Sequence, residues 1–311
     1  MDEIDISLSL LLMVNSRITY KELAEMFNMS VNSIHKRIKS LVDLGVIQGF
    51  KSKLGFTNFP GITNIIIFGI SNIKQKKQLI NKLGENEFIY NVTQCSGNAL
   101  YIHAYLRNIG ELDALVSFIR KTGNLTDLII GIDKRMPPII VEELNFKPPT
   151  DLDYLIINSL KDNSRKSISD IALELGVSTK TIRRRLDRLT ENYLIQFQID
   201  WYPDKTGIIN TIINLELDSN AIIDDREFEN RLKQKLGSNI LFTWAFSNLP
   251  NFKLVLIWTK SMKELQDLQS LLSFENYKKI DLNILIEGKM FPTWIDTFLE
   301  DKVNEIKTKS Q

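Results

Sequence analysis

Apolar residues recur three or four positions apart in two separated segments, one at the start of the chain and one near its middle. Each segment is predicted to form three consecutive amphipathic helices. In the first segment, Thr19 and Glu22 have the spacing of a capping box, and Ser30 is a candidate N-cap for the third helix. In the second segment, Ser178 takes the place of Ser30. The three-helix plan therefore occurs twice.

The two helical segments are copies of one another. A shift of 148 residues aligns Ile4–Phe50 with Leu152–Gln198 without a gap, and 12 of the 47 positions are identical. Asn15-Ser16-Arg17 falls on Asn163-Ser164-Arg165, and several other apolar positions keep an apolar residue. An internal repeat of this length predicts a duplicated architecture.

Short apolar runs bounded by turn residues follow each helical segment and predict β-strands. In each half the order is β-α-β-β-α-β, which is typical of ferredoxin-like domains. Strands are expected at residues 62–70, 87–95, 99–107 and 125–133, and again at 208–217, 239–247, 252–259 and 279–287. Residues 45–54 and 194–201, directly after the third helix of each copy, are expected to form short wings.

These elements predict an α+β protein in which two winged helix-turn-helix domains alternate with two ferredoxin-like (βαββαβ) sheet domains. The predicted boundaries are 1–55 and 60–138 for the first pair, 139–150 for a linker, 151–203 and 207–290 for the second pair, and 291–311 for a C-terminal amphipathic helix. Because each sheet has one face without helices, the two sheets are expected to bury each other within one chain.

The composition narrows the classes of function. The chain has 311 residues with 39 Lys and Arg against 38 Asp and Glu, so nucleic-acid binding must depend on local patches rather than on a bulk basic field. The single Cys95 cannot form an internal disulfide, which favours a cytoplasmic location. Two His and one Cys leave little material for a metal site, and no cofactor is predicted. No apolar run approaches the roughly 20 residues of a membrane-spanning helix.

The third helix of each helical segment has one apolar face and one polar face. Ile34, Ile38 and Leu41 share the apolar face in the first copy. A helix-turn-helix motif places this helix in the major groove, where Arg, Lys and Asn reach base edges and phosphates. The residues predicted to contact double-stranded DNA are Asn32, Ser33, His35, Lys36, Arg37, Lys39, Lys180, Thr181, Arg183, Arg184, Arg185 and Arg188. The alternative is a solvated charged face that has no ligand.

Arg37 and Arg185 are equivalent residues that lie beside the apolar face of each third helix. Two roles fit this position equally well. The side chain can clamp a DNA phosphate, or it can form a salt bridge that attaches the helix to its own domain.

Several motifs resemble the Lrp/AsnC (leucine-responsive, feast/famine) family of transcriptional regulators. They include Leu23-Ala24 with Ser30, Gly45-Val46-Ile47-Gln48-Gly49-Phe50 and Tyr202-Pro203-Asp204-Lys205-Thr206-Gly207. The resemblance covers nearly the whole chain, as two units fused head to tail. Family members usually have one unit per chain and pair through their sheet domains. The resemblance implies a sequence-specific DNA-binding transcriptional regulator that folds as an intrachain pseudo-dimer.

The same resemblance implies a small-molecule effector near the loop before the third strand, where the family often has a G-x-x-D-Y pattern. This chain has Gly97-Asn98-Ala99-Leu100-Tyr101 in one copy and Asn248-Leu249-Pro250-Asn251-Phe252 in the other. Both lack the acidic residue that would pair with an amino-acid ammonium group, so amino-acid sensing is disfavoured, and the loop residues can instead hold another small polar ligand. Its candidate ligands are Ser96, Gly97, Asn98, Ser247, Asn248 and Asn251. The alternative is that these are simply turn residues.

Two other functions fit parts of the pattern. The chain resembles sirohaem-type tetrapyrrole decarboxylases in its predicted architecture. These enzymes need His and Arg around the tetrapyrrole, but the only sheet-domain histidine, His103, is expected inside a strand rather than as a catalytic base. A protein that organises DNA without sequence preference is disfavoured by the near-zero net charge. We therefore expect a regulator rather than an enzyme. Self-association beyond the intrachain pseudo-dimer is a further possibility that the sequence does not decide.

Overall fold

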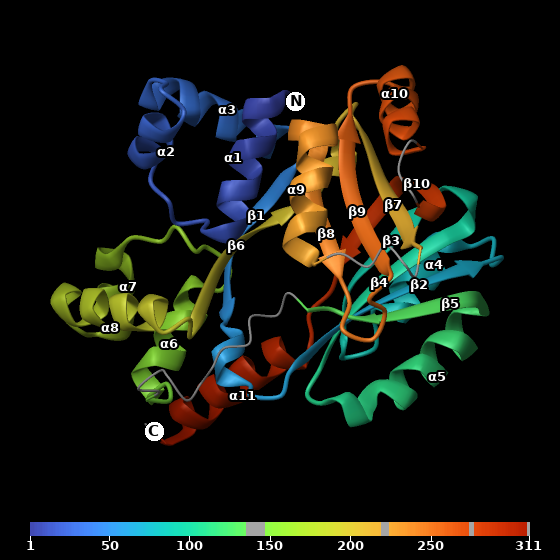
Figure 1. Ribbon diagram of the computed structural model, residues 1–311. Coiled ribbons are helices and arrows are strands. Elements are labelled where there is room, and N and C mark those ends of the chain that lie inside the picture. The colour runs from blue at the N-terminus through green and yellow to red at the C-terminus, as the bar shows by residue number, and fades with distance from the viewer. Residues whose placement is uncertain (135–146, 219–223, 274–276, 310–311) are drawn as a thin grey trace. The chain divides into compact units, whose positions relative to one another are not determined.

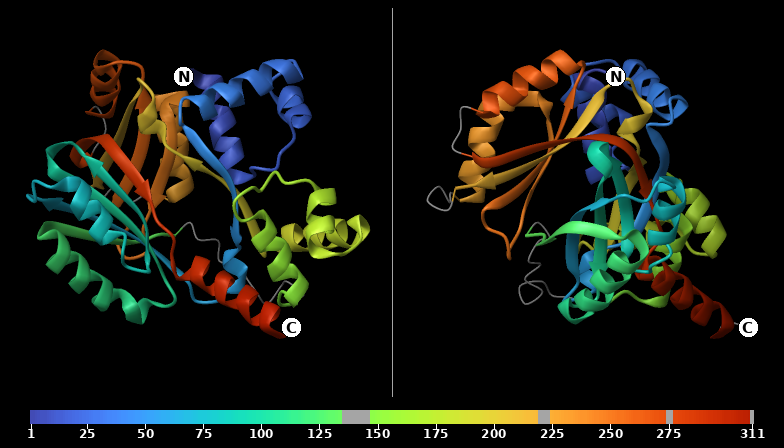
Figure 2. Two further views of the ribbon diagram at one scale, coloured as in Figure 1. Left: turned by 180° about the vertical axis from the view of Figure 1, so that it is seen from behind. Right: turned by 90° about the vertical axis from the view of Figure 1, so that its right-hand side faces the viewer.

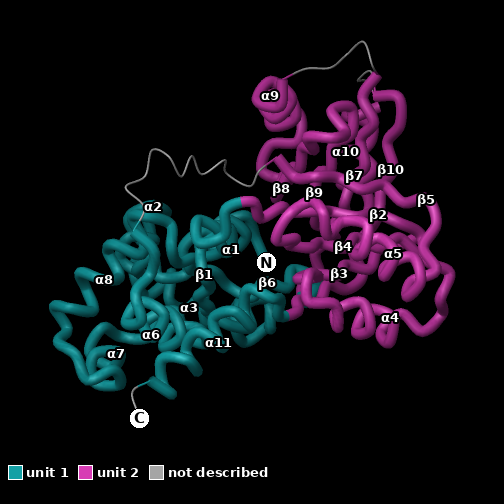
Figure 3. Tube along the Cα trace, turned by 90° about the horizontal axis from the view of Figure 1, so that it is seen from below, with its two compact units in different colours: residues 1–60, 138–205, 292–311 teal, residues 61–137, 206–291 magenta. Residues whose placement is uncertain are grey.

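The computed structural model describes residues 1–134, 147–218, 224–273 and 277–309. The chain divides into two compact units, which Figure 3 distinguishes by colour. The helical unit comprises residues 1–60, 138–205 and 292–311, and the sheet unit comprises residues 61–137 and 206–291. Each unit therefore combines segments from both copies of the repeat. Most of the predicted linker at 139–150 lies outside the described residues.

The helical unit contains two three-helix domains with equivalent elements (Figure 1). The first domain has α1 (Glu3–Val14), α2 (Tyr20–Met26), α3 (Val31–Asp43) and the strand β1 (Ile47–Leu54); the second has α6 (Asp151–Leu160), α7 (Ile168–Leu175), α8 (Thr179–Glu191) and β6 (Ile195–Trp201). Side-chain caps set the helix starts as the sequence predicts. Thr19 and Glu22 form a capping box on α2, and Ser30 and Ser178 cap α3 and α8.

The strands expected as wings at residues 45–54 and 194–201 are present as β1 and β6, but the sequence did not indicate how they pair. They pair with each other as an antiparallel two-stranded ribbon. Phe50 lies opposite Ile199, and Lys51 lies opposite Gln198. A shift of 148 residues exchanges these two pairs, so the internal two-fold axis of the helical unit passes through the ribbon.

The C-terminal segment forms α11 (Trp294–Lys309), the amphipathic helix that the sequence predicts. Its buried side packs on α6 and β1, so it contacts both copies of the helical unit. The rings of Trp294 and Phe298 meet the Phe59 ring edge-on, at centroid distances of 4.9 and 5.4 Å. None of the described helices is both long enough and apolar enough to cross a lipid bilayer.

The sheet unit contains two βαββαβ domains whose described strands join into one eight-stranded sheet. The first domain has β2 (Thr63–Ser71), α4 (Lys76–Leu83), β3 (Ile89–Cys95), β4 (Ala99–Leu106), α5 (Leu112–Gly123) and β5 (Leu125–Ile132); the second has β7 (Ile209–Leu217), α9 (Asp225–Leu236), β8 (Ile240–Ala245), β9 (Phe252–Thr259), α10 (Met262–Ser273) and β10 (Tyr277–Met290). The strand orders β5-β2-β4-β3 and β10-β7-β9-β8 are both ferredoxin-like. Buried Leu and Ile side chains fill the space between each half-sheet and its helices.

The long strand β10 connects the two half-sheets (Figure 2). Its first part pairs with β7, and its last part, from Leu285 to Met290, pairs with β3 of the other copy. At the opposite ends of the sheet, Asp133 forms a β-bridge with Phe246. A Cβ atom at Gly131 would lie 2.2 Å from the Phe246 ring, so this approach requires glycine. The two half-sheets thus pair within one chain, and the intrachain pseudo-dimer is confirmed.

Polar side chains cross the space between the half-sheets. The Tyr101 hydroxyl donates to Asn214 Oδ1 at 2.6 Å and accepts from Asn283 Nδ2 at 2.9 Å. All three side chains are buried, and they come from both copies. Because an unpaired polar group in this space would cost free energy, these hydrogen bonds favour one alignment of the half-sheets.

His103 lies in the same space, within β4, as the sequence predicts. Its ring faces the rings of Tyr90 and Trp244 at centroid distances of 5.6 and 6.0 Å. Its Nδ1 atom lies 3.3 Å from the Tyr90 hydroxyl. Burial lowers the pKa of His103 to about 4, so the imidazole is neutral at pH 7.

This lowered pKa predicts a loss of stability in mild acid. An unfolded His takes up its proton near pH 6.5, whereas folded His103 does so near pH 4, so the free energy of unfolding falls by at most about 1.4 kcal/mol per pH unit between these values. The variant His103→Gln lacks this contribution, and its melting temperature should fall less between pH 7 and pH 5. The exposed His35 provides the control, because His35→Gln should follow the unaltered protein. Equal acid sensitivity of His103→Gln and the unaltered protein would contradict the prediction.

Candidate nucleic-acid interface and ligand pocket

The outward face of α3 is polar and exposed. Asn32, His35, Lys36 and Lys39 are exposed, which places four of the six residues predicted for this copy on the open face. Ser33 is half-buried, and its hydroxyl lies 2.8 Å from that of the N-cap residue Ser30. The α3 face thus presents two ammonium groups, an amide and an imidazole.

The outward face of α8 is more basic. Lys180, Arg183 and Arg184 are exposed, whereas Thr181 is half-buried with its hydroxyl 2.9 Å from the hydroxyl of Ser178. Exposed guanidinium groups can bind phosphate or the guanine edge through two hydrogen bonds. The two recognition helices therefore occupy equivalent positions but present different chemistry.

Arg37 and Arg185 form the same kind of ion pair in the two copies. Arg37 Nη1 donates to Asp5 Oδ1 at 2.7 Å and to Asp2 Oδ2 at 2.9 Å. Arg185 Nη1 donates to Asp153 Oδ2 at 3.2 Å, and Asp153 is the repeat equivalent of Asp5. The hydrogen bond to Asp5 raises the pKa of Arg37. Of the two roles considered for these arginines, the structure favours the salt bridge that attaches the recognition helix to the first helix of its domain.

Arg188 turns inward rather than outward, which corrects its placement on the DNA-facing side of α8. Its Nη2 donates to Asp153, and its Nη1 donates to the Lys147 carbonyl oxygen at 3.3 Å. Asp153 is fully buried and accepts from Arg185 as well. Arg188 therefore helps to neutralise a buried carboxylate, and the exposed basic face of α8 is smaller than the sequence pattern indicates.

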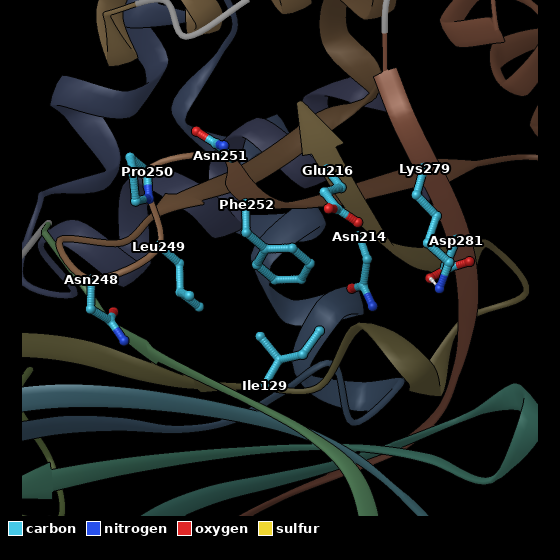
Figure 4. A pocket seen from close by; sticks show the side chains of 10 residues that line it. All are labelled: Ile129, Asn214, Glu216, Asn248, Leu249, Pro250, Asn251, Phe252, Lys279 and Asp281. Atoms are coloured by element: carbon cyan, nitrogen blue, oxygen red, sulfur yellow. Dashed lines mark ion pairs between the residues drawn. The ribbon is translucent and has the colours of Figure 1, made fainter. Parts of the chain in front are cut away.

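The sheet unit contains a pocket of about 380 Å³ at the loop between β8 and β9. Its lining comes from β5, β7, β9, β10 and the β8–β9 loop: Ile129, Asn214, Glu216, Asn248, Leu249, Pro250, Asn251, Phe252, Lys279 and Asp281. Figure 4 shows the Phe252 ring in the middle of this lining, with Asn248 on one side and Lys279 and Asp281 on the other. Lys279 Nζ lies 2.7 Å from Asp281 Oδ2.

Two buried amide atoms of the pocket have no hydrogen-bond partner among the described residues. They are the donor Asn214 Nδ2 and the acceptor Asn251 Oδ1. A buried polar atom without a partner costs roughly 1–3 kcal/mol. A bound molecule that supplies one acceptor and one donor can recover this free energy.

The residues predicted to bind a ligand are only partly brought together. Asn248 and Asn251 line the pocket, whereas Ser247 and the first-copy residues do not. Asn248 also pairs with the β5 backbone, accepting from Ile132 N–H and donating to the Ile130 carbonyl, both at 2.8 Å. In the first copy, Ser96 Oγ accepts from Ile284 N–H at 3.0 Å, Asn98 Nδ2 lies 3.4 Å from Asn72 Oδ1, and Gly97 adopts a left-handed turn conformation.

Sequence reasoning missed the polar strand residues of the pocket and the two carboxylates among them. The cross-strand pair Asn214–Asp281 occupies the position that Phe68–Ile129 occupies in the first copy. One copy therefore has polar side chains where the other has apolar ones. A strand-by-strand comparison of the two copies could have found this signal, but only with the strand register known.

Two segments of the chain match known DNA-binding families. Residues 1–48 match the family described as "Winged helix-turn-helix DNA-binding", and residues 150–190 match the "AsnC-type helix-turn-helix domain". These segments contain the two sets of helices described above. The protein is a DNA-binding transcriptional regulator with two helix-turn-helix domains.

Curated relatives identify the family. An uncharacterized HTH-type transcriptional regulator of Pyrococcus abyssi is 38% identical over 155 residues, which is 46% of this chain and 92% of the relative. The HTH-type transcriptional regulator LrpA of the same organism is 27% identical over 144 residues, which is 46% of this chain and 98% of LrpA. The chain belongs to the Lrp/AsnC family, in a tandem-duplicated form. Each relative aligns over nearly its whole length but covers less than half of this chain, because this chain contains two copies of a unit that is about as long as one relative.

A solved structure of the sirohaem decarboxylase NirDL has the same duplicated architecture. It aligns with a TM-score of 0.59 and 13% identity, covering 98% of this chain and 100% of NirDL. At this identity the likeness concerns the fold alone. The family assignment rests on the sequence relatives.

We expect Asp153→Ala to destabilise the second helix-turn-helix domain. The change leaves Arg185 and Arg188 without their shared carboxylate and removes the capping partner of Thr150. Breaking a buried ion pair costs roughly 3–5 kcal/mol. Because both arginines are about a quarter exposed, the free energy of unfolding should fall by about 3 kcal/mol. Urea unfolding measured by circular dichroism tests this. Asp187→Ala on the exposed face of α8 should change stability by less than about 0.5 kcal/mol. Equal stability of the two variants would refute the role of Asp153.

Proposed function

We propose that one chain binds an asymmetric pair of half-sites on duplex DNA through the exposed faces of α3 and α8. The supporting observation is the chemical difference between two equivalent helices. His35 and Lys36 of α3 correspond to Arg183 and Arg184 of α8. Arginine can bind the O6 and N7 atoms of guanine through two hydrogen bonds, whereas Lys, Asn and His offer a different set of contacts. The α8 half-site is therefore the stronger one and contains guanine.

The contacting residues in this proposal are the exposed ones. They are Asn32, His35, Lys36 and Lys39 on α3, and Lys180, Arg183 and Arg184 on α8. Ser33 and Thr181 sit at the helix N-termini, where the hydroxyl and backbone N–H groups can meet a phosphate. Arg37, Arg185 and Arg188 act indirectly, by holding each recognition helix on its domain.

We also propose that the protein regulates transcription without an enzymatic activity. The relatives are named as transcriptional regulators, whereas NirDL is similar in fold. The space beside His103 is occupied by aromatic rings, since Tyr90 stacks on Tyr105 at 4.0 Å and Trp244 lies against His103. This arrangement favours a packed interface over a site for a tetrapyrrole.

The DNA interface is tested by the double variant Arg183→Ala/Arg184→Ala. Its affinity for a duplex selected from a random pool should fall, and the slope of log affinity against log salt should decrease by about one for each lost phosphate contact. The variant Glu191→Ala, which alters an exposed charge at the end of α8, is the control for surface changes. A folded double variant with unchanged affinity and salt slope would remove the α8 face as a DNA contact.

We further propose that a small polar molecule binds the pocket beside Phe252 and modulates DNA binding. The two unpaired amide atoms of Asn214 and Asn251 support this. The first copy has Phe68 and Ile129 at the equivalent positions, which supports one ligand per chain rather than two.

The pocket is tested by thermal shift with a panel of small amides, amino acids and carboxylates. At least one compound should raise the melting temperature, and calorimetry should give one bound molecule per chain. Asn251→Gly removes an unpaired acceptor and should abolish the shift. Asn98→Gly, at the corresponding loop of the first copy, is the matched control and should retain it. Equal responses of the two variants would contradict the assignment of the pocket.

A further inference from the structure

The loops before α2 and α7 contact each other across the internal two-fold axis of the helical unit. They hold the identical triplets Asn15-Ser16-Arg17 and Asn163-Ser164-Arg165. The hydroxyls of Ser16 and Ser164, which are 148 residues apart, lie 2.6 Å from each other and are fully buried. Each loop also bonds to the strand of the other copy, because Ser164 N–H donates to the Phe50 carbonyl at 2.8 Å and Ser16 N–H to the Phe197 carbonyl at 3.3 Å.

The two arginines of these loops reach across the axis in opposite directions. Arg17 Nη1 donates to the Lys166 carbonyl at 3.1 Å, and Arg165 Nη2 donates to the Ile18 carbonyl at 3.0 Å. Lys166 is the repeat equivalent of Ile18, so the two bonds are images of each other. The arginine of each copy therefore bonds to the backbone of the other copy, just before the second helix of that other copy.

These guanidinium groups make their described contacts with carbonyls and rings rather than with carboxylates. Arg165 lies over the rings of Tyr20 and Phe50 at 4.7 and 4.8 Å, and Arg17 lies over the Phe197 ring at 5.6 Å. Burial lowers the pKa of both arginines, and the proximity of Arg165 lowers that of Arg17 further. Two like charges held together without an acidic partner oppose folding, so a role other than stability is favoured.

The contact extends to a recognition helix. Tyr20, under Arg165, is the first residue of α2, and its ring meets the His35 ring on α3 edge-on at 5.4 Å. A residue of the second copy thus supports the DNA-facing side of the first copy through one aromatic ring. The position of α3 is thereby coupled to the position of the opposite domain.

We propose that Arg17 and Arg165 are positioning residues that fix the separation and the helical phase of the two recognition helices, so that the protein selects the spacing between half-sites as well as their sequence. This inference rests on the proposed DNA interface. Recognition helices that belong to one rigid pair bind two grooves only at a matching separation. Helices that move independently tolerate several separations.

The test uses the full chain and a duplex selected from a random pool, with about five base pairs, half a helical turn, inserted between the two protected segments. Insertion should lower the affinity of the unaltered protein by roughly 100-fold, because one recognition helix loses its groove. In Arg17→Met/Arg165→Met the penalty should shrink to about tenfold, because the β1–β6 ribbon still joins the two domains, while the affinity for each isolated half-site stays unchanged. Lys74→Met/Lys77→Met, which removes two exposed positive charges, one just before α4 and one in its first turn, is the control and should retain the full penalty.

If Arg17→Met/Arg165→Met fails to fold, Arg17→Lys/Arg165→Lys replaces it, because lysine keeps both positive charges but lacks the planar guanidinium that bonds the opposite carbonyl and lies over the rings. A folded variant that keeps the full spacing penalty overturns the inference. So does an unaltered protein that binds both spacings equally, and in that case the DNA interface itself survives. An unaltered protein that selects no duplex at all overturns the proposed interface together with the inference.

Discussion

The antiparallel pairing of β1 with β6 is the contact on which the helical unit depends. A two-stranded ribbon is marginal by itself, but here each strand also bonds to the loop of the opposite copy, and α11 packs against β1. Because the ribbon and the Ser16–Ser164 contact lie on one axis, the two helix-turn-helix domains are held as a pair within one chain. A regulator with one copy per chain must obtain the same pairing from a second molecule.

In the helical unit, the two copies share the ion pair that attaches the recognition helix but differ at exposed positions. Arg37 with Asp5 and Arg185 with Asp153 repeat the same ion pair at the same spacing. By contrast, Lys39 corresponds to Asp187 on the open faces of α3 and α8. A buried carboxylate needs its partner, whereas an exposed side chain can change without loss of stability. The sheet unit diverges at a buried position, because the buried Asn214 stands at the position of Phe68.

The elements that depend on local patterns could be predicted from the sequence, and the contacts between distant segments could not. Capping residues such as Thr19 and Ser30 mark the helix starts, and apolar spacing identifies the buried face of α3. The pairing of β1 with β6 is not predictable from the sequence. The two strands come from different copies, and the residue pattern of neither strand identifies its partner. The polar helical position of Arg188 predicts an outward side chain, whereas the buried carboxylate of Asp153, 35 residues away, turns it inward. The pocket was missed because its charged residues come from strands that meet only in the folded sheet.

On the proposed interface, one polypeptide places two chemically different recognition helices on one DNA segment. The decisive measurement is hydroxyl-radical footprinting of a selected duplex, combined with the solution mass of the complex. A complex with one chain should protect two different sequences about 10 base pairs apart. Mutation of the guanine-containing sequence should lower the affinity more than mutation of the other sequence. The mass is essential, because two assembled chains would double the footprint and restore its symmetry. A single chain that protects a perfect palindrome, with equal loss of affinity when either half is altered, would show that the two recognition helices read the same sequence.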